Sequence, residues 1–157
     1  MPERAASAEL HEVCASTAWS ARLLTHRPYA TVDALFAASD SAVAELTPTD
    51  LAEAMAGHPP IGRPKTGDPL SASEQRGMSG ASDDLKNDVL ELNLAYQERF
   101  GHVFLICATG RTGEQLRDAL RARLGNTPEQ ERAIVRTELG KINRIRLARL
   151  VPPARRA

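Results

Sequence analysis

The segment from Gly57 to Gln75, GHPPIGRPKTGDPLSASEQ, constrains the fold more than any other part of the chain. It holds four prolines and three glycines, which interrupt regular hydrogen bonding or free the backbone. We therefore expect one long irregular loop, which no helix crosses. His58 stands directly before Pro59 and Pro60, and a residue before proline is restricted to extended geometry.

The two ends of this loop carry side chains suited to acid–base chemistry. Histidine has a pKa near neutrality, and a carboxylate can orient it or balance its charge. His58 lies at one end, and Glu74 with Gln75 at the other. Two plainer interpretations stay open. His58 could be an ordinary loop histidine, and Ser71-x-x-Glu74 matches a capping box that only ties the start of a helix.

The remaining sequence predicts helices. Apolar residues recur at helical spacing, most clearly from Leu85 to Phe100, and proline, glycine and capping residues separate the patterned segments. The fold class is therefore all-α: a single domain over residues 1–157, with about seven to eight helices, a long Pro/Gly-rich loop, and flexible ends at about 1–5 and 152–157. The expected helical segments are 6–27 (two helices broken near Thr17), 31–46, 48–56, 82–100, 112–125 and 127–150.

Two further features do not fit a plain helical bundle. The apolar segment His102–Ala108 could be a buried strand, but the sequence offers no second strand to pair with it. We expect an extended or single-turn segment that crosses the core. Arg146 falls on the apolar arc of the last helix, where a guanidinium needs an anionic partner or a wet pocket. It could also merely reach the surface or pair with a neighbouring acid.

Composition excludes several functions. The 157 residues carry 20 basic and 20 acidic side chains and are only 4% aromatic, which argues against nucleic-acid binding. Cys14 and Cys107 lie far apart and outside any metal-type spacing, so we expect no metal site and a reduced, cytoplasmic setting. No apolar run approaches the roughly 20 residues that span a membrane.

Several short blocks occur in an order that resembles one enzyme family, the 2-oxo-4-hydroxy-4-carboxy-5-ureidoimidazoline (OHCU) decarboxylases of uric acid breakdown. The resemblance is close from Gly57 to Leu150 and looser in the N-terminal helices. The blocks are His-Pro with Ile-Gly, Ser-x-x-Glu-Gln, Leu-Asn-x-x-Tyr-x-x-Arg-Phe-Gly, Phe-Leu-Ile-Cys-Ala, Arg-Leu-Gly-Asn and Lys-Ile-x-x-Ile-Arg-Leu.

The resemblance implies a role for each matching position. His58 would be the catalytic histidine and Glu74 its acidic partner. The substrate-binding positions would be Pro59, Ser71, Glu74, Gln75, Phe104, Leu105, Ile106, Cys107, Ala108 and Arg146. The family further implies an all-helical, cofactor-free enzyme, commonly a homodimer, that decarboxylates OHCU to (S)-allantoin.

The chain departs from the family pattern in the loop, where His-Pro-Pro-Ile-Gly-Arg replaces His-Pro-Asp-Leu-Ala-Gly. This leaves the shape of the loop open.

One alternative is a non-catalytic helical module that binds a ureido or purine-derived anion. A second is a hydrolase of 5-hydroxyisourate, which should show more histidines and a β-rich pattern. The sequence shows neither the additional histidines nor the β-rich pattern.

Overall fold

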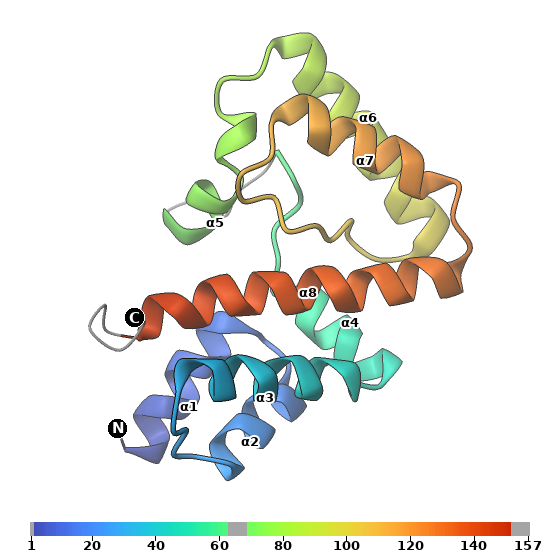
Figure 1. The fold of residues 1–157 in the computed structure, drawn as a ribbon. Helices are drawn as coiled ribbons and strands as arrows, with labels where there is room; N and C mark the ends of the chain where they lie inside the picture. Colours follow the sequence, from blue (N-terminus) through green and yellow to red (C-terminus); the bar gives the residue numbers. More distant parts are fainter. Residues whose placement is uncertain (1, 63–68, 152–157) are drawn as a thin grey trace. The chain divides into compact units, whose positions relative to one another are not determined.

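The computed structural model describes residues 2–62 and 69–151, with only the main chain described for 69–71. These residues form eight α-helices, one short 3-10 helix and no strand, which confirms the all-α prediction (Figure 1). The elements are α1 Glu3–Val13, α2 Thr17–Thr25, α3 Val32–Ala44, α4 Pro48–Ala56, α5 Pro69–Glu74, η1 Arg76–Met78, α6 Asp83–Phe100, α7 Gly113–Leu124 and α8 Pro128–Leu150.

Local sequence signals set most of the helix ends. Thr47 and Thr112 form capping boxes with Asp50 and Gln115, so each pair satisfies otherwise unbonded N–H groups at a helix start. Gly101 ends α6 in the left-handed region at φ 76°, which a glycine adopts without strain. These predicted boundaries are confirmed.

The expectation of an irregular loop as far as Gln75 is wrong at its second half. Pro69–Glu74 form the helix α5, and Pro69 occupies the first helical position, where the missing N–H of proline has no consequence. The capping-box interpretation of Ser71 and Glu74 is also wrong, because Glu74 lies at the end of α5 and not in its first turn.

The described chain divides into two compact units. One, called here the outer unit, comprises the residues up to Gly57 and those from Arg136 onward; the other, the central unit, is His58–Val135. In the outer unit α2 packs against α1, α3 and α4. Trp19 is fully buried there, and its indole Nε1–H donates to Ser39 Oγ at 3.2 Å. The prediction of a single domain over 1–157 stays a prediction.

In the central unit α6 and α7 lie side by side (Figure 1). Between them the chain runs through residues 103–108 without regular secondary structure, as predicted for this apolar segment. The core of the unit joins this segment to both helices and to the loop after His58. Its buried members are Ile61, Met78, Leu85, Val89, Tyr96, Phe104, Ile106, Ala108, Leu116 and Leu120.

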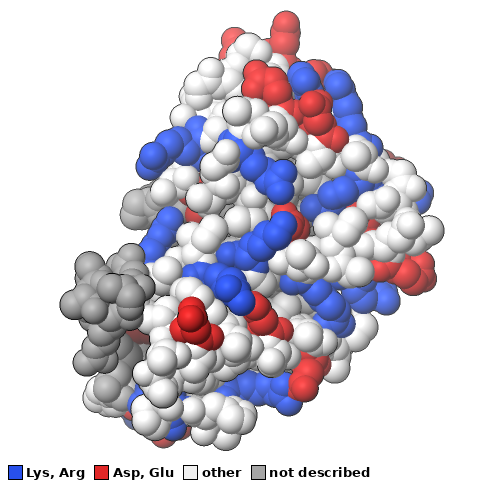
Figure 2. All heavy atoms as spheres, viewed as in Figure 1, with Lys and Arg blue, Asp and Glu red and all other residues white. Residues whose placement is uncertain are grey.

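Charge of both signs is mixed on the molecular surface. Figure 2 shows basic and acidic side chains interspersed on the face that it draws, in keeping with the formal net charge of zero. Cys14 and Cys107 are both buried, and they do not form a disulfide with each other. None of the described helices is long and apolar enough to cross a membrane.

Candidate functional site

The loop that presents His58 is fastened by side chains from outside it. His58 follows the end of α4 and is half-buried, as is Pro59. Asn93 of α6 donates through Nδ2 to the Ile61 carbonyl at 2.9 Å. Gly62 then turns the chain at φ 87°, a conformation suited to glycine. The main chain after His58 is therefore fixed, although no regular structure runs through it.

Gln75 fastens the same loop from its other end. Its Oε1 accepts the Gly62 N–H at 2.9 Å, and its Nε2 donates to the Pro60 carbonyl at 3.0 Å. The side chain is 6% exposed, so these bonds replace contacts with water. Gln75 thus binds the loop itself, and the prediction that it also contacts the substrate stays a prediction.

Glu74 is brought to the loop by its neighbour. It is half-buried, ends α5 and directly precedes Gln75. Because Gln75 is bonded to Pro60 and Gly62, the acidic end of the segment lies beside the loop that begins with His58. The side chain of Ser71 lies outside the described residues.

The apolar strip, residues Phe104–Ala108, is buried along its whole length, with exposures of 1–8%. Phe104, Ile106 and Ala108 share a core with Ile61 of the His58 loop. The central unit therefore assembles three of the predicted site elements: the His58 loop, the Glu74–Gln75 pair and the apolar strip.

A buried polar network backs the strip, and no sequence pattern singled it out. Arg123 and Glu131 form an ion pair with Nη2 and Oε1 2.8 Å apart, at side-chain exposures of 9% and 0%. Asn126 and Tyr96 also donate to the carboxylate, at 2.9 and 2.5 Å. Tyr96, Arg123 and Asn126 all lie in the blocks that resemble the decarboxylase family, and this was the signal available in the sequence.

The network sets the charge of its members. Burial raises the pKa of the Glu131 carboxyl, but hydrogen bonds from Arg123, Asn126 and Tyr96 outweigh burial and hold that pKa below its ordinary value. Burial, and next the bond to Glu131, raise the pKa of the Tyr96 phenol well above its ordinary value. Glu131 is therefore an anion, and Tyr96 a neutral donor, at neutral pH.

Arg146 belongs to the outer unit. It is 7% exposed, and its Nη1 donates to the Val13 carbonyl at 2.9 Å. Val13 ends α1, and the connection from α1 to α2 also approaches Gly57 closely. A Cβ added to Gly57 would lie only 2.8 Å from the Cβ of Ala15 in that connection. Arg146 is thus anchored at the start of the connection that packs on the residue before His58. That Arg146 joins His58 and Glu74 in one cleft stays a prediction.

A cavity of about 460 Å³ opens between η1 and the start of α7. Its lining includes Ser73, Arg76, Arg111 and Glu114, but neither His58 nor Glu74. Among residues 2–62 and 69–151, no group of three or more His, Cys, Asp or Glu side chains is placed to hold a metal ion.

The chain is similar in sequence to proteins of known family. A family model described as OHCU decarboxylase matches residues 1–148. The uric acid degradation bifunctional protein TTL of Arabidopsis thaliana is 31% identical over 144 residues, which are 87% of this chain and 44% of that protein. An OHCU decarboxylase of Amia calva is 43% identical over 60 residues, 38% of this chain and 34% of that one. The chain thus spans less than half the length of these relatives.

A solved structure extends the likeness to the fold. The crystal structure of an OHCU decarboxylase in the presence of (S)-allantoin superimposes with a TM-score of 0.81 at 28% sequence identity. The match covers 90% of this chain and 96% of that one.

Proposed function

Because the chain belongs to the OHCU decarboxylase family, we propose that it decarboxylates OHCU to (S)-allantoin in the breakdown of uric acid. The observation that carries this proposal is the pair of bonds from Gln75 to Pro60 and Gly62. These bonds join the His-Pro block to the Ser-x-x-Glu-Gln block, which supports a shared site for the imidazole of His58 and the carboxylate of Glu74. The crystal structure of the relative in the presence of (S)-allantoin supports the product.

The reaction needs an electron sink and a positioned proton donor. In OHCU the carboxylate sits on a ring carbon that also bears a hydroxyl and adjoins a ring C=N bond. When the bond to the carboxylate breaks, carbon dioxide leaves and the electron pair moves into the C=N system. One proton is taken up, and transfer of the hydroxyl hydrogen to the adjacent carbon gives the carbonyl and the stereocentre of allantoin. The ring itself accepts the electron pair, so no separate electron sink is demanded.

Each residue has a role in this scheme. His58 engages the hydroxyl or the carboxylate and delivers a proton to one face, which yields one enantiomer. Glu74 orients the imidazole and balances its charge. Arg146 binds the carboxylate of the substrate as a planar, permanently charged donor.

The remaining positions hold the ring. Pro59, Ser71 and Gln75 contact it, and the main chain of Phe104, Leu105, Ile106, Cys107 and Ala108 supplies fixed dipoles for the charge that develops on it. The enzyme acts as a cytoplasmic homodimer, and sedimentation equilibrium of the purified protein tests its dimeric state directly.

The decisive experiment generates OHCU in place with urate oxidase and hydroxyisourate hydrolase and follows circular dichroism of allantoin. We expect rapid, enantiomerically pure (S)-allantoin with the wild type, and a rate close to the spontaneous reaction with His58→Asn. A wild-type protein that binds allantoin but leaves the spontaneous rate unchanged would instead be the non-catalytic helical module.

A further inference from the structure

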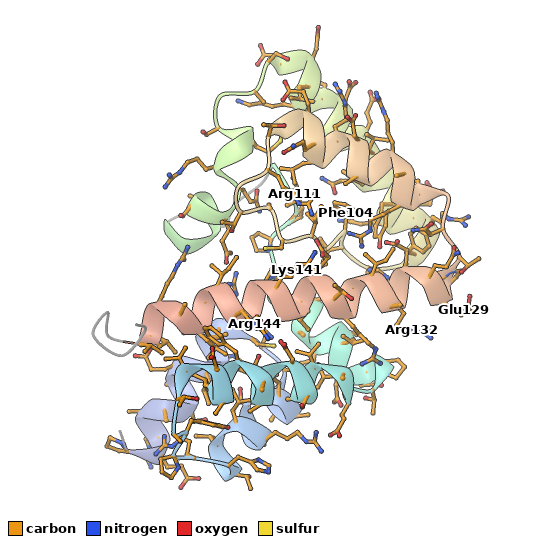
Figure 3. The ribbon with its side chains drawn as sticks, in the orientation of Figure 1. Phe104, Arg111, Glu129, Arg132, Lys141 and Arg144 are labelled. Atoms are coloured by element: carbon orange, nitrogen blue, oxygen red, sulfur yellow. The ribbon has the colours of Figure 1, made fainter. Side chains whose placement is uncertain are left out.

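Two arginines hold alternate carbonyls of the apolar strip. Arg123 Nη1 donates to the Leu105 carbonyl at 2.7 Å, and Arg111 Nε donates to the Cys107 carbonyl at 3.1 Å. Figure 3 labels Arg111 together with Phe104, the first residue of the strip. Both donors come from the segment that follows the strip, one just before α7 and one inside it.

This spacing leaves the other edge of the strip available. In an extended chain the N–H and C=O of successive residues point to opposite sides. Bonds to the carbonyls of Leu105 and Cys107, two residues apart, are what one side of such a chain would show, with Ile106 on the other side. Ile106 is 6% exposed. No hydrogen bond among the described residues uses its main-chain N–H or C=O. A buried peptide group without a partner is rare and unfavourable, which indicates a site for an external donor and acceptor.

Arg123 is itself held in place. Its Nε donates to Glu131 Oε1 at 2.9 Å, and its guanidinium carbon lies 4.3 Å from the centre of the Phe104 ring. One planar fork therefore bonds the carboxylate and the Leu105 carbonyl together while it stacks on the strip, a geometry that a lysine ammonium does not reproduce.

Arg111 is anchored through its main chain. Its N–H donates to the Ala108 carbonyl at 3.0 Å, and its own carbonyl lies so close to Gly77 that a Cβ there would be 2.0 Å away. Gly110, before it, has φ 79°. Because the backbone is fixed on both sides, the Arg111 side chain meets the Cys107 carbonyl from a set direction.

We propose that Arg111 and Arg123 are positioning residues, which grip the Leu105 and Cys107 carbonyls so that the Ile106 N–H and C=O face the substrate. One donor and one acceptor side by side complement an N–H and a C=O of a ureido group or cyclic amide. This inference rests on the proposed function, because it assigns the open edge of the strip to OHCU.

The test compares Arg111→Ala and Arg123→Lys with Arg121→Ala, which removes an exposed arginine from α7, the helix that carries Arg123. We expect both strip variants to fold, with KM raised and kcat lowered, so that kcat/KM for OHCU falls by about a hundred-fold, as misplaced binding groups typically cause. Arg111→Lys can still donate to the Cys107 carbonyl, so it should keep most of the kcat/KM that Arg111→Ala loses. A lysine at position 123 cannot replace the guanidinium in this way, so Arg123→Lys should keep the full loss. Folded strip variants with the kcat/KM of Arg121→Ala would overturn the proposal.

A second measurement does not depend on activity. Hydrogen exchange of the peptide that covers residues 103–109 should be faster in Arg111→Ala and Arg123→Lys than in Arg121→Ala. In each of the first two variants the strip has lost an arginine that holds one of its carbonyls. Unchanged exchange rates in both variants would show that the two arginines do not hold the strip in place. If the wild type fails to convert OHCU, the proposed function fails instead, and the exchange result still decides whether the two arginines hold the strip.

Discussion

Tyr96 donates to Glu131 at 2.5 Å, between two side chains that are both fully buried. This bond links the C-terminal part of α6 to the first turn of α8 inside the central unit. It fixes the carboxylate that in turn orients Arg123, so a contact remote from His58 helps to define the strip that we assign to the substrate.

Glu131 should make stability depend on pH. Its pKa is lowered in the folded protein, so its contribution is fully present above the unfolded pKa of about 4.5 and is lost as pH falls through the folded value. We expect Glu131→Gln to destabilise the protein by about 3–5 kcal/mol at pH 7, because it leaves the buried Arg123 charge uncompensated.

Urea unfolding of the wild type and Glu131→Gln at pH 7 and at pH 3.5 checks this dependence. The difference in the free energy of unfolding between the two proteins should be smaller at pH 3.5 than at pH 7. An equal difference in the free energy of unfolding at the two pH values would show that the ionised carboxylate of Glu131 is not what stabilises the fold.

Gln75→Leu should loosen the His58 loop. It removes the acceptor of the Gly62 N–H and the donor to the Pro60 carbonyl, so both main-chain groups lose their side-chain partner. We expect a loss of about 1–3 kcal/mol in the free energy of unfolding, and a lower kcat because His58 is less well positioned. The matched control is Gln97→Leu on the exposed face of α6, which should change neither quantity.

His58→Asn should separate catalysis from stability. The side chain is only half-buried, so the melting temperature should stay close to that of the wild type. Loss of a positioned acid–base group should lower kcat by about 10²- to 10⁴-fold. His11→Asn, at an exposed position of α1, serves as the control. Near-normal turnover by a folded His58→Asn protein would remove this residue from the mechanism.

Glu74→Gln should lower kcat while the side-chain volume is kept. An amide cannot balance an imidazolium charge, so the rate should fall most on the side of the pH profile where His58 must be protonated. A uniform loss at every pH would point to a binding role alone. Full pH profiles of kcat and of kcat/KM for the wild type and Glu74→Gln make the distinction.

Gly77→Ala tests the close packing behind Arg111. The new Cβ would lie 2.0 Å from the Arg111 carbonyl oxygen, a main-chain atom that cannot turn aside. We expect a loss of about 1–3 kcal/mol, typical of overpacking. The methyl group of Gly80→Ala would meet no atom within 4 Å, so this variant should be nearly neutral. Equal stability of the two variants in urea unfolding would contradict the close approach.

Sequence patterns predicted most of the fold because most of its boundaries are local. Thr47, Thr112 and Gly101 act within a few residues of themselves, and caps of this kind are visible in a sequence. The helix α5 was missed because the prolines and glycines that precede it dominated the pattern, although Pro69 is well suited to its first position.

The site was less accessible to sequence reasoning because its contacts are long-range. His58 and Glu74 were predicted as site residues through residue type and resemblance, and their roles stay a prediction. The grip of Arg123 on Leu105 joins residues 18 positions apart, and the bond from Tyr96 to Glu131 joins residues 35 apart. No periodicity or spacing rule reports such pairs, which depend on how helices pack.

The bonds from Gln75 to Pro60 and Gly62 also bear on how this protein can be altered. A single side-chain amide makes both bonds to the turn that follows His58, so a substitution at Gln75 acts on stability and on the candidate site at once. Selection for a stable fold and selection for activity therefore act on the same position, and a variant library for either property should keep Gln75 unchanged.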